Sequence, residues 1–121
     1  MKRGIFRATV LVLGAVLGSG TTLMAGAVNG PRKDCLKVSG ETYHTLIIWF
    51  VGNEEARVTL IGDGKADLDL YVYDQSGKQV ACDEDATATC LVSWTPSQTA
   101  SYTIKIVNRG QAESSYCLTS N

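Results

Sequence analysis

The sequence predicts an all-β fold, an antiparallel, jelly-roll-like β-sandwich of seven to eight strands. Short segments such as residues 67–74 alternate apolar with polar or aromatic side chains, and this period of two is typical of a strand with one buried face. Turn-forming glycine, asparagine, aspartate and proline residues separate these segments at short, regular spacing. No segment shows the 3.6-residue periodicity of an amphipathic helix, so we expect sheet packed on sheet.

The first 27 residues have the composition of a secretory signal peptide. A basic start is followed by a mostly apolar run at 5–17, and Ala25-Gly26-Ala27 offers small residues where a signal peptidase reads them. We therefore expect cleavage after Ala27 and no transmembrane anchor afterwards. An uncleaved membrane anchor is the alternative, although the apolar run is short and contains glycine.

Cleavage would leave one domain, residues 28–121. It holds 8 Lys and Arg against 12 Asp and Glu, and this negative charge argues against a nucleic-acid partner. A cation or a basic partner suits the charge better. The leader predicts a secreted or periplasmic location.

The four cysteines are expected to form two disulfides, because export leads to an oxidising compartment. In regular strands Cys82 and Cys90 would point inward, whereas Cys35 and Cys117 would point outward. The predicted bonds are therefore Cys82–Cys90 and Cys35–Cys117. A zinc site is the alternative, but the chain has no C-x-x-C pair and a single histidine, His44.

The expected strands follow in chain order: an edge strand at 36–38, then strands at 44–51, 56–61, 67–74, 78–82, 90–94, 102–107 and 115–119. The segment 44–51 is apolar on both faces, which predicts a central strand buried between two layers. Trp49 and Trp94 lie on apolar strands and are expected in the core.

Segments 67–74 and 78–82 read as a hairpin. Gln75-Ser76-Gly77 fits a three-residue loop with Gly77 in the left-handed conformation. This loop predicts a register in which Val72 pairs with Val80, and Leu70 with Cys82.

Extending that register sets Asp69 opposite Asp83 and Asp67 opposite Asp85. Like charges directly opposite are destabilising, so these carboxylates need a cation, hydrogen-bond donors or full solvation. One hypothesis is a Ca²⁺ site formed by Asp67, Asp69, Asp83 and Asp85, with Asp63 or Glu84 as a further ligand, because calcium prefers six to eight oxygen ligands. The alternative is a solvated acidic rim whose aspartates cap turns.

Tyr71 and Tyr73 share the polar face of the same strand. They are candidate ligand-binding residues, since exposed aromatic rings can stack on a sugar or a peptide. The alternative is that the rings only cover the sheet.

Catalysis is not expected. A small sandwich with short loops has little room for a cleft with paired carboxylates. The single candidate base, His44, begins a strand that looks buried, and the serines lie in turns without a nucleophile motif.

The block from Gly62 to Thr119 resembles the bacterial pre-peptidase C-terminal domain family, of which collagenase collagen-binding domains are relatives. The matching segments are GDGKADLDLYVYD at 62–74, DEDA at 83–86, SWTP at 93–96, SYTIKIVNRG at 101–110 and YCLT at 116–119.

This resemblance implies a secreted, non-catalytic, jelly-roll-like sandwich, and several members of the family bind calcium or an extracellular polymer. Such domains usually follow a peptidase, which these 121 residues do not include. The predicted function is an exported binding or accessory module that contacts an extracellular or envelope polymer or protein. The alternative is a structural or chaperone-like subunit supporting a separate exported enzyme, such as a peptidase.

Overall fold

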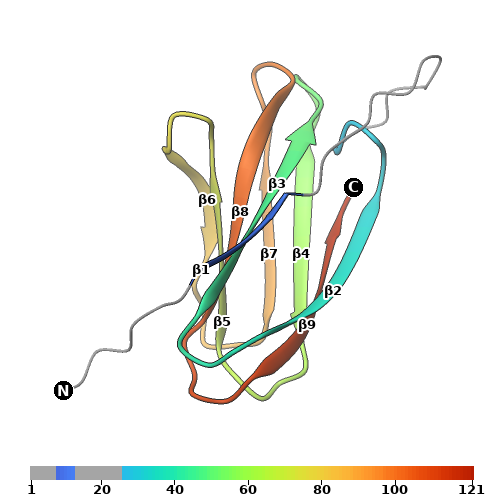
Figure 1. Cartoon of the computed structure of the whole chain (residues 1–121). Helices are drawn as coiled ribbons and strands as arrows, with labels where there is room; N and C mark the ends of the chain where they lie inside the picture. The colour runs from blue at the N-terminus through green and yellow to red at the C-terminus, as the bar shows by residue number, and fades with distance from the viewer. Residues whose placement is uncertain (1–7, 13–25) are drawn as a thin grey trace.

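Two β-sheets pack face to face in the computed structural model, which describes residues 8–12 and 26–121 (Figure 1). The strand order is β1-β3-β8-β5-β6 in one sheet and β2-β9-β4-β7 in the other. The strands are β1 Ala8–Val12, β2 Arg32–Val38, β3 Tyr43–Phe50, β4 Ala56–Gly62, β5 Leu68–Tyr73, β6 Gln79–Asp83, β7 Thr89–Trp94, β8 Ala100–Asn108 and β9 Ser114–Ser120.

All strand pairs are antiparallel except β1 with β3. The predicted β-sandwich is therefore confirmed, and β2 is an edge strand as expected. Across residues 8–12 and 26–121, no helix has the length and hydropathy needed to cross a membrane.

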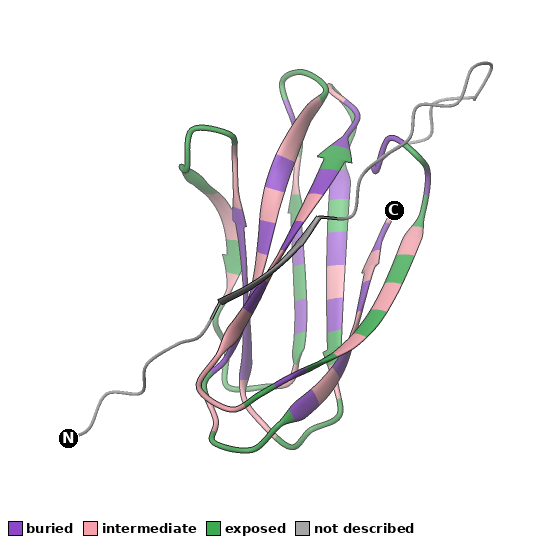
Figure 2. Ribbon diagram, viewed as in Figure 1, coloured by how far each residue is buried: buried purple, intermediate pink, exposed green. Residues whose placement is uncertain are grey.

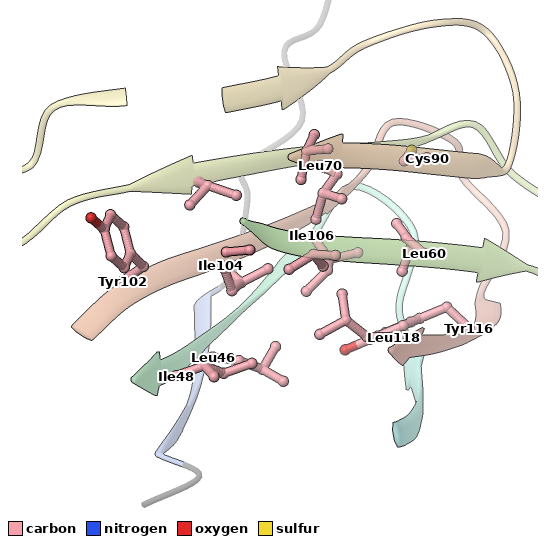
Figure 3. Close-up of a cluster of buried hydrophobic side chains, with 14 of the residues drawn as sticks. Leu46, Ile48, Leu60, Leu70, Cys90, Tyr102, Ile104, Ile106, Tyr116 and Leu118 are labelled. Carbon is pink, nitrogen blue, oxygen red and sulfur yellow. The ribbon is translucent and has the colours of Figure 1, made fainter. Parts of the chain in front are cut away.

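The core lies between the two sheets and is built mainly from alternate residues of strands β2–β5 and β7–β9. Buried and more exposed positions alternate along the ribbons in Figure 2, as period-two side-chain direction requires. Figure 3 shows the inward side chains, among them Leu46 and Ile48 of β3, Ile104 of β8, Leu60 of β4 and Leu118 of β9. Each fully buried aliphatic side chain stabilises the fold by about 1.5–3 kcal/mol.

Strand β3 differs from its prediction. Its inward residues are buried, but its outward residues Thr45 and Ile47 are half-buried and Trp49 is 41% exposed. The expected burial of both faces, and of Trp49, is therefore wrong, because among residues 8–12 and 26–121 no second layer covers the outer face of this sheet. Trp94 is half-buried and packs edge-on against Phe50, with 4.9 Å between ring centroids.

The β5–β6 hairpin contains a β-bulge that the sequence did not reveal. Gly77 has φ 85° and Asp74 N–H donates to the Lys78 carbonyl at 2.9 Å, which confirms the three-residue loop. Tyr73 then pairs with Gln79 but Val72 pairs with Ala81, so Val80 is the extra residue.

The bulge shifts the rest of the hairpin by one residue. Leu70 lies opposite Asp83, and Tyr71 lies opposite Cys82. The predicted pairing of Val72 with Val80 and of Leu70 with Cys82 is therefore wrong, and so is the pairing of Asp67 and Asp69 with Asp85 and Asp83 that was extrapolated from it.

The same shift also affects which cysteines can form a disulfide. Cys35 and Cys117 face each other across β2 and β9 and form the predicted disulfide, with 4.1 Å between their Cα atoms. The predicted Cys82–Cys90 bond is wrong, because the bulge turns Cys82 to the exposed outer face while Cys90 stays in the core. The Cys90 thiol donates to the Leu68 carbonyl at 3.1 Å.

Residues 26–28 belong to the fold and lie beside the C-terminal end of β3. Ala27 is 1% exposed, and its N–H donates to the carbonyl of Asn121 at 2.7 Å. Val28 N–H donates to the Trp49 carbonyl at 2.9 Å, and Val51 N–H donates to the Gly26 carbonyl at 2.8 Å. This segment therefore ties β3 of one sheet to the end of β9 in the other.

Candidate functional site: the acidic end

Four loops meet at one end of the sandwich, the lower end in Figure 1. They are residues 39–42, 63–67, 84–88 and 109–113. Backbone hydrogen bonds join them in sequence: Glu41 N–H to the Gly110 carbonyl at 2.8 Å, Arg109 N–H to the Asp67 carbonyl at 3.0 Å, and Gly62 N–H to the Ala88 carbonyl at 2.8 Å. The loops therefore hold one another in place.

Carboxylates concentrate at this end, which we call the acidic end. Its acidic residues are Glu41, Asp63, Asp67, Asp69, Asp83, Glu84, Asp85 and Glu113. These are eight of the twelve acidic residues in the chain, whereas the four loops carry two basic residues, Lys65 and Arg109. Such an imbalance produces a negative potential that attracts a positively charged partner.

Asp69 lies on β5 and is 5% exposed, so its charge needs compensation. Arg109 supplies it, since its Nε donates to Asp69 Oδ2 at 2.8 Å. Arg109 Nη2 also donates to the Tyr71 hydroxyl at 2.9 Å, and that hydroxyl donates to Glu84 Oε2 at 2.7 Å. Burial, followed by the Glu84 hydrogen bond, raises the pKa of Tyr71 to about 12. This network fixes Glu84 at the start of its loop.

Three further aspartates are held by local donors. Asp85 Oδ1 accepts from the Thr87 hydroxyl at 2.6 Å and from Thr87 N–H at 2.9 Å, and these bonds lower its pKa. Asp63 accepts from Lys65 N–H and Ser115 N–H, each at 3.0 Å, and these backbone bonds lower its pKa. Asp83 Oδ2 accepts from Leu91 N–H at 3.0 Å. These aspartates therefore hold turns and neighbouring strands together.

Asp67 has a buried carboxylate oxygen, Oδ1, without a hydrogen-bond partner. Burial raises the pKa of Asp67, and the charges of Asp69 and Asp85 raise it further. The second buried oxygen of Asp69, Oδ1, also has no partner.

The charges of the four predicted metal ligands all act on one buried thiol, that of Cys90. Burial raises the pKa of Cys90 to about 12, and the charges of Asp83, Asp85, Asp69 and Asp67 add to the effect in that order. Among the residues whose side chains the structure describes, however, no three His, Cys, Asp or Glu side chains are placed to hold a metal ion together.

Tyr71 and Tyr73 lie on the outer face of the same sheet. Their rings stack with centroids 6.3 Å apart and planes 19° apart. Tyr71 is 8% exposed, so it mainly covers the sheet. Tyr73 lines an open depression of about 480 Å³ together with Ile47, Thr103 and other residues of the outer face.

Sequence reasoning missed Arg109, Glu41 and Glu113 as members of this end. Arg109 reaches Asp69 because β8 lies beside β5, a pairing of distant segments that no turn signal predicts. Glu41 has φ 55°, an uncommon conformation for a non-glycine residue. Gly40 precedes it, and a Cβ atom at this position would clash with the Gln111 carbonyl oxygen. The glycine allows the two loops to touch.

The described residues thus define a disulfide-linked β-sandwich with an acidic loop end. Two solved structures have the same fold. The Aeromonas hydrophila protein PliG, a periplasmic lysozyme inhibitor of g-type lysozyme, aligns over 95% of this chain and 98% of its own, with a TM-score of 0.62 and 8% identity. The pre-peptidase C-terminal domain of Bacillus anthracis collagenase aligns over 96% of both chains, with a TM-score of 0.56 and 9% identity.

The second similarity agrees, at the level of fold, with the family resemblance read from the sequence. Neither a protein-family profile nor a curated protein sequence matches the chain.

Proposed function

We propose that this protein is an exported, non-catalytic module that binds a basic protein partner through its acidic end. The observation that supports this proposal most directly is the concentration of eight carboxylates at the acidic end, six on four loops that are hydrogen-bonded to one another and two, Asp69 and Asp83, on the adjoining strands. Loops held by a rigid scaffold commonly carry binding residues. Complementary charge then increases the association rate and discriminates between partners.

Export is supported by two further features. The Cys35–Cys117 disulfide is characteristic of proteins from oxidising compartments. The leader has the composition of a signal peptide, and PliG, which shares the fold, is periplasmic.

The partner we propose to test first is a lysozyme of the g-type, because PliG inhibits that enzyme and has the same fold. The protein would bind as an inhibitor, with the acidic end against a basic surface of the enzyme. An extracellular polymer and a separate exported enzyme are the competing partners.

The experiment compares two matched triple variants in lysozyme binding and inhibition. Glu41→Gln, Glu113→Gln and Asp85→Asn neutralise the acidic end. Glu54→Gln, Glu55→Gln and Asp74→Asn, at the opposite end, remove the same charge. We expect the first triple to weaken binding about tenfold or more at low salt, with little difference between variants at high salt. Equal losses in both triples, or no binding by the native chain at low salt, would overturn the proposal.

A calcium ion at the acidic end is a second proposal. It is supported by Asp67 Oδ1 and Asp69 Oδ1, two buried carboxylate oxygens without hydrogen-bond partners. Carbonyl oxygens and water would have to supply most of the remaining ligands.

Thermal melts with calcium and with chelator test this second proposal. A ligand at about a hundred times its dissociation constant stabilises by roughly 2.7 kcal/mol, or about 10–20 °C for a domain of this size. The shift should be absent in Asp67→Asn. Identical melting temperatures with calcium and chelator would rule the ion out.

A further inference from the structure

Strand β3 has an edge that carries none of the features that usually protect an edge strand. Sheet edges are normally blunted by charged residues, proline, bulges or short length. The eight residues of β3 (Tyr43–Phe50) include no lysine, arginine, acid or proline, and the strand pairs regularly with β8 along its whole length. By contrast, the edge strand β2 carries Arg32, Lys33 and Lys37, and the edge strand β6 is bulged.

In the full chain this edge is covered by β1, residues 8–12, which pairs with Tyr43–Ile47 in parallel. Those five residues lie inside the predicted signal peptide. If the leader is removed on export, the backbone groups of β3 that face β1 lose their partners. An unprotected, uncharged strand edge then accepts another strand.

The hydrogen bonds at the upper end of β3 show which residues face this edge. Trp49 accepts from Val28 and Val51 donates to Gly26, both on the side away from β8. The N–H and C=O of one residue point to the same side of a strand, and this direction alternates along the chain. The backbone groups of Tyr43, Thr45 and Ile47 therefore face the same edge.

These three residues would form favourable cross-strand pairs with the same three residues of a second copy of the chain. In antiparallel pairing around a two-fold axis at Thr45, each Tyr43 lies opposite the Ile47 of the other copy, and Thr45 lies opposite Thr45. Aromatic with β-branched pairs and threonine with threonine pairs are among the favourable cross-strand combinations. Each of the three pairs would exchange two backbone hydrogen bonds. No like charges meet across this interface.

We propose that the exported protein forms a two-fold dimer through β3, in which the β3 of a second copy replaces β1. The two five-stranded sheets, each without β1, join into one continuous eight-stranded sheet. The acidic ends stay outside the paired edge, because their loops lie beyond the strand ends. The dimer would therefore carry two acidic ends.

The test uses protein recovered after export, with its N-terminus confirmed by intact mass, and measures its molar mass by light scattering from about 1 to about 300 µM. We expect a concentration-dependent dimer. Thr45→Lys should abolish it, because two lysines would face each other across the axis. Thr59→Lys is the matched control, since Thr59 is also half-buried and outward-facing but lies on β4.

A cross-linking variant gives an independent readout in a Cys82→Ser background. Thr45→Cys should form a covalent dimer rapidly, and Thr59→Cys should not. The unprocessed chain with Thr45→Cys should stay uncross-linked because β1 fills the edge. A monomeric exported protein over the whole range, or equal cross-linking of the two cysteine variants, would overturn the proposal. Circular dichroism confirms that each variant is folded.

Discussion

Arg109 is the residue on which the charge balance of the acidic end depends. It forms an ion pair with the buried Asp69 and also donates a hydrogen bond to the Tyr71 hydroxyl. Removing one partner of a buried pair leaves the other charge uncompensated, which typically costs 3–5 kcal/mol. The Arg109 side chain is 44% exposed, so water would replace part of the lost interaction.

We therefore predict that Arg109→Met lowers stability by about 2 kcal/mol, or roughly 10 °C in melting temperature. Adding Asp69→Asn should recover part of the loss, because the buried charge is then gone. Lys65→Met, in a neighbouring loop, is the control and should change the melting temperature little. A double variant as unstable as the sum of its single changes would contradict this account.

His44 gives the protein a pH-dependent stability. It is 9% exposed, its Nδ1 lies 2.8 Å from the Tyr116 hydroxyl, and burial lowers its pKa. Because the pKa in the folded state is lower than in the unfolded state, the unfolded chain binds the proton first as pH falls. The stability is thus fully present above about pH 6.5 and is lost below it.

Thermal melts between about pH 7.5 and about pH 5 should show this loss, and His44→Leu should flatten the dependence. His44 is the single histidine of the chain, so no other histidine titrates in this window. A slope unchanged by His44→Leu would contradict the prediction.

At the scale of elements, the segment Gly26–Val28 acts as a clasp between the two sheets. A chain that begins at Val28 loses the bond from Ala27 N–H to Asn121 and the bond from Val51 N–H to Gly26, together with the buried Ala27 side chain. We predict that residues 28–121 melt about 10 °C below residues 26–121, since two such bonds and one small buried side chain are worth about 2 kcal/mol. Equal melting temperatures would show that the clasp adds nothing.

The strands could be predicted from local sequence patterns, but the geometry of the acidic end depends on how distant strands pair. The three-residue loop was predictable because Gly77 satisfies a conformational need within the loop itself. The bulge at Val80 could not be predicted. Val80 and Ala81 both contact the core, so the sequence is equally compatible with a strand that alternates regularly. That one residue reversed the predicted direction of Cys82 and moved Asp83 away from Asp69.

The sequence predicted that aspartates concentrate at this end, but it did not predict how the side chains are arranged there. Asp67 to Asp85 are close in sequence, so their convergence at one hairpin end followed from the hairpin alone. Arg109 joins them through the pairing of β8 with β5, and Glu41 joins through contact between two loops. Their positions depend on sheet order, which local periodicity does not encode.

For the whole molecule, the Cys35–Cys117 bond is the largest single constraint. It closes a loop of 82 residues, and in the chain-entropy treatment such a loop contributes about 4.5 kcal/mol as an upper estimate. We predict that the double variant Cys35→Ser, Cys117→Ser melts at least about 15 °C lower, whereas Cys82→Ser melts like the native chain. Destabilisation by Cys82→Ser of the same size would contradict the free state of that thiol.

The disulfide also changes how the protein responds to force. It joins the first strand after the clasp to the last strand, so tension applied between residue 26 and the C-terminus is carried through the sulfur bridge. Only the stretches outside the bridge, about thirteen residues, can be drawn out, which gives roughly 45 Å of extension. With the bridge reduced, the same pull can unravel the whole domain to roughly 330 Å. An anchored copy of this protein would therefore extend only a short way under tension while it is oxidised, and would unfold along its whole length after reduction.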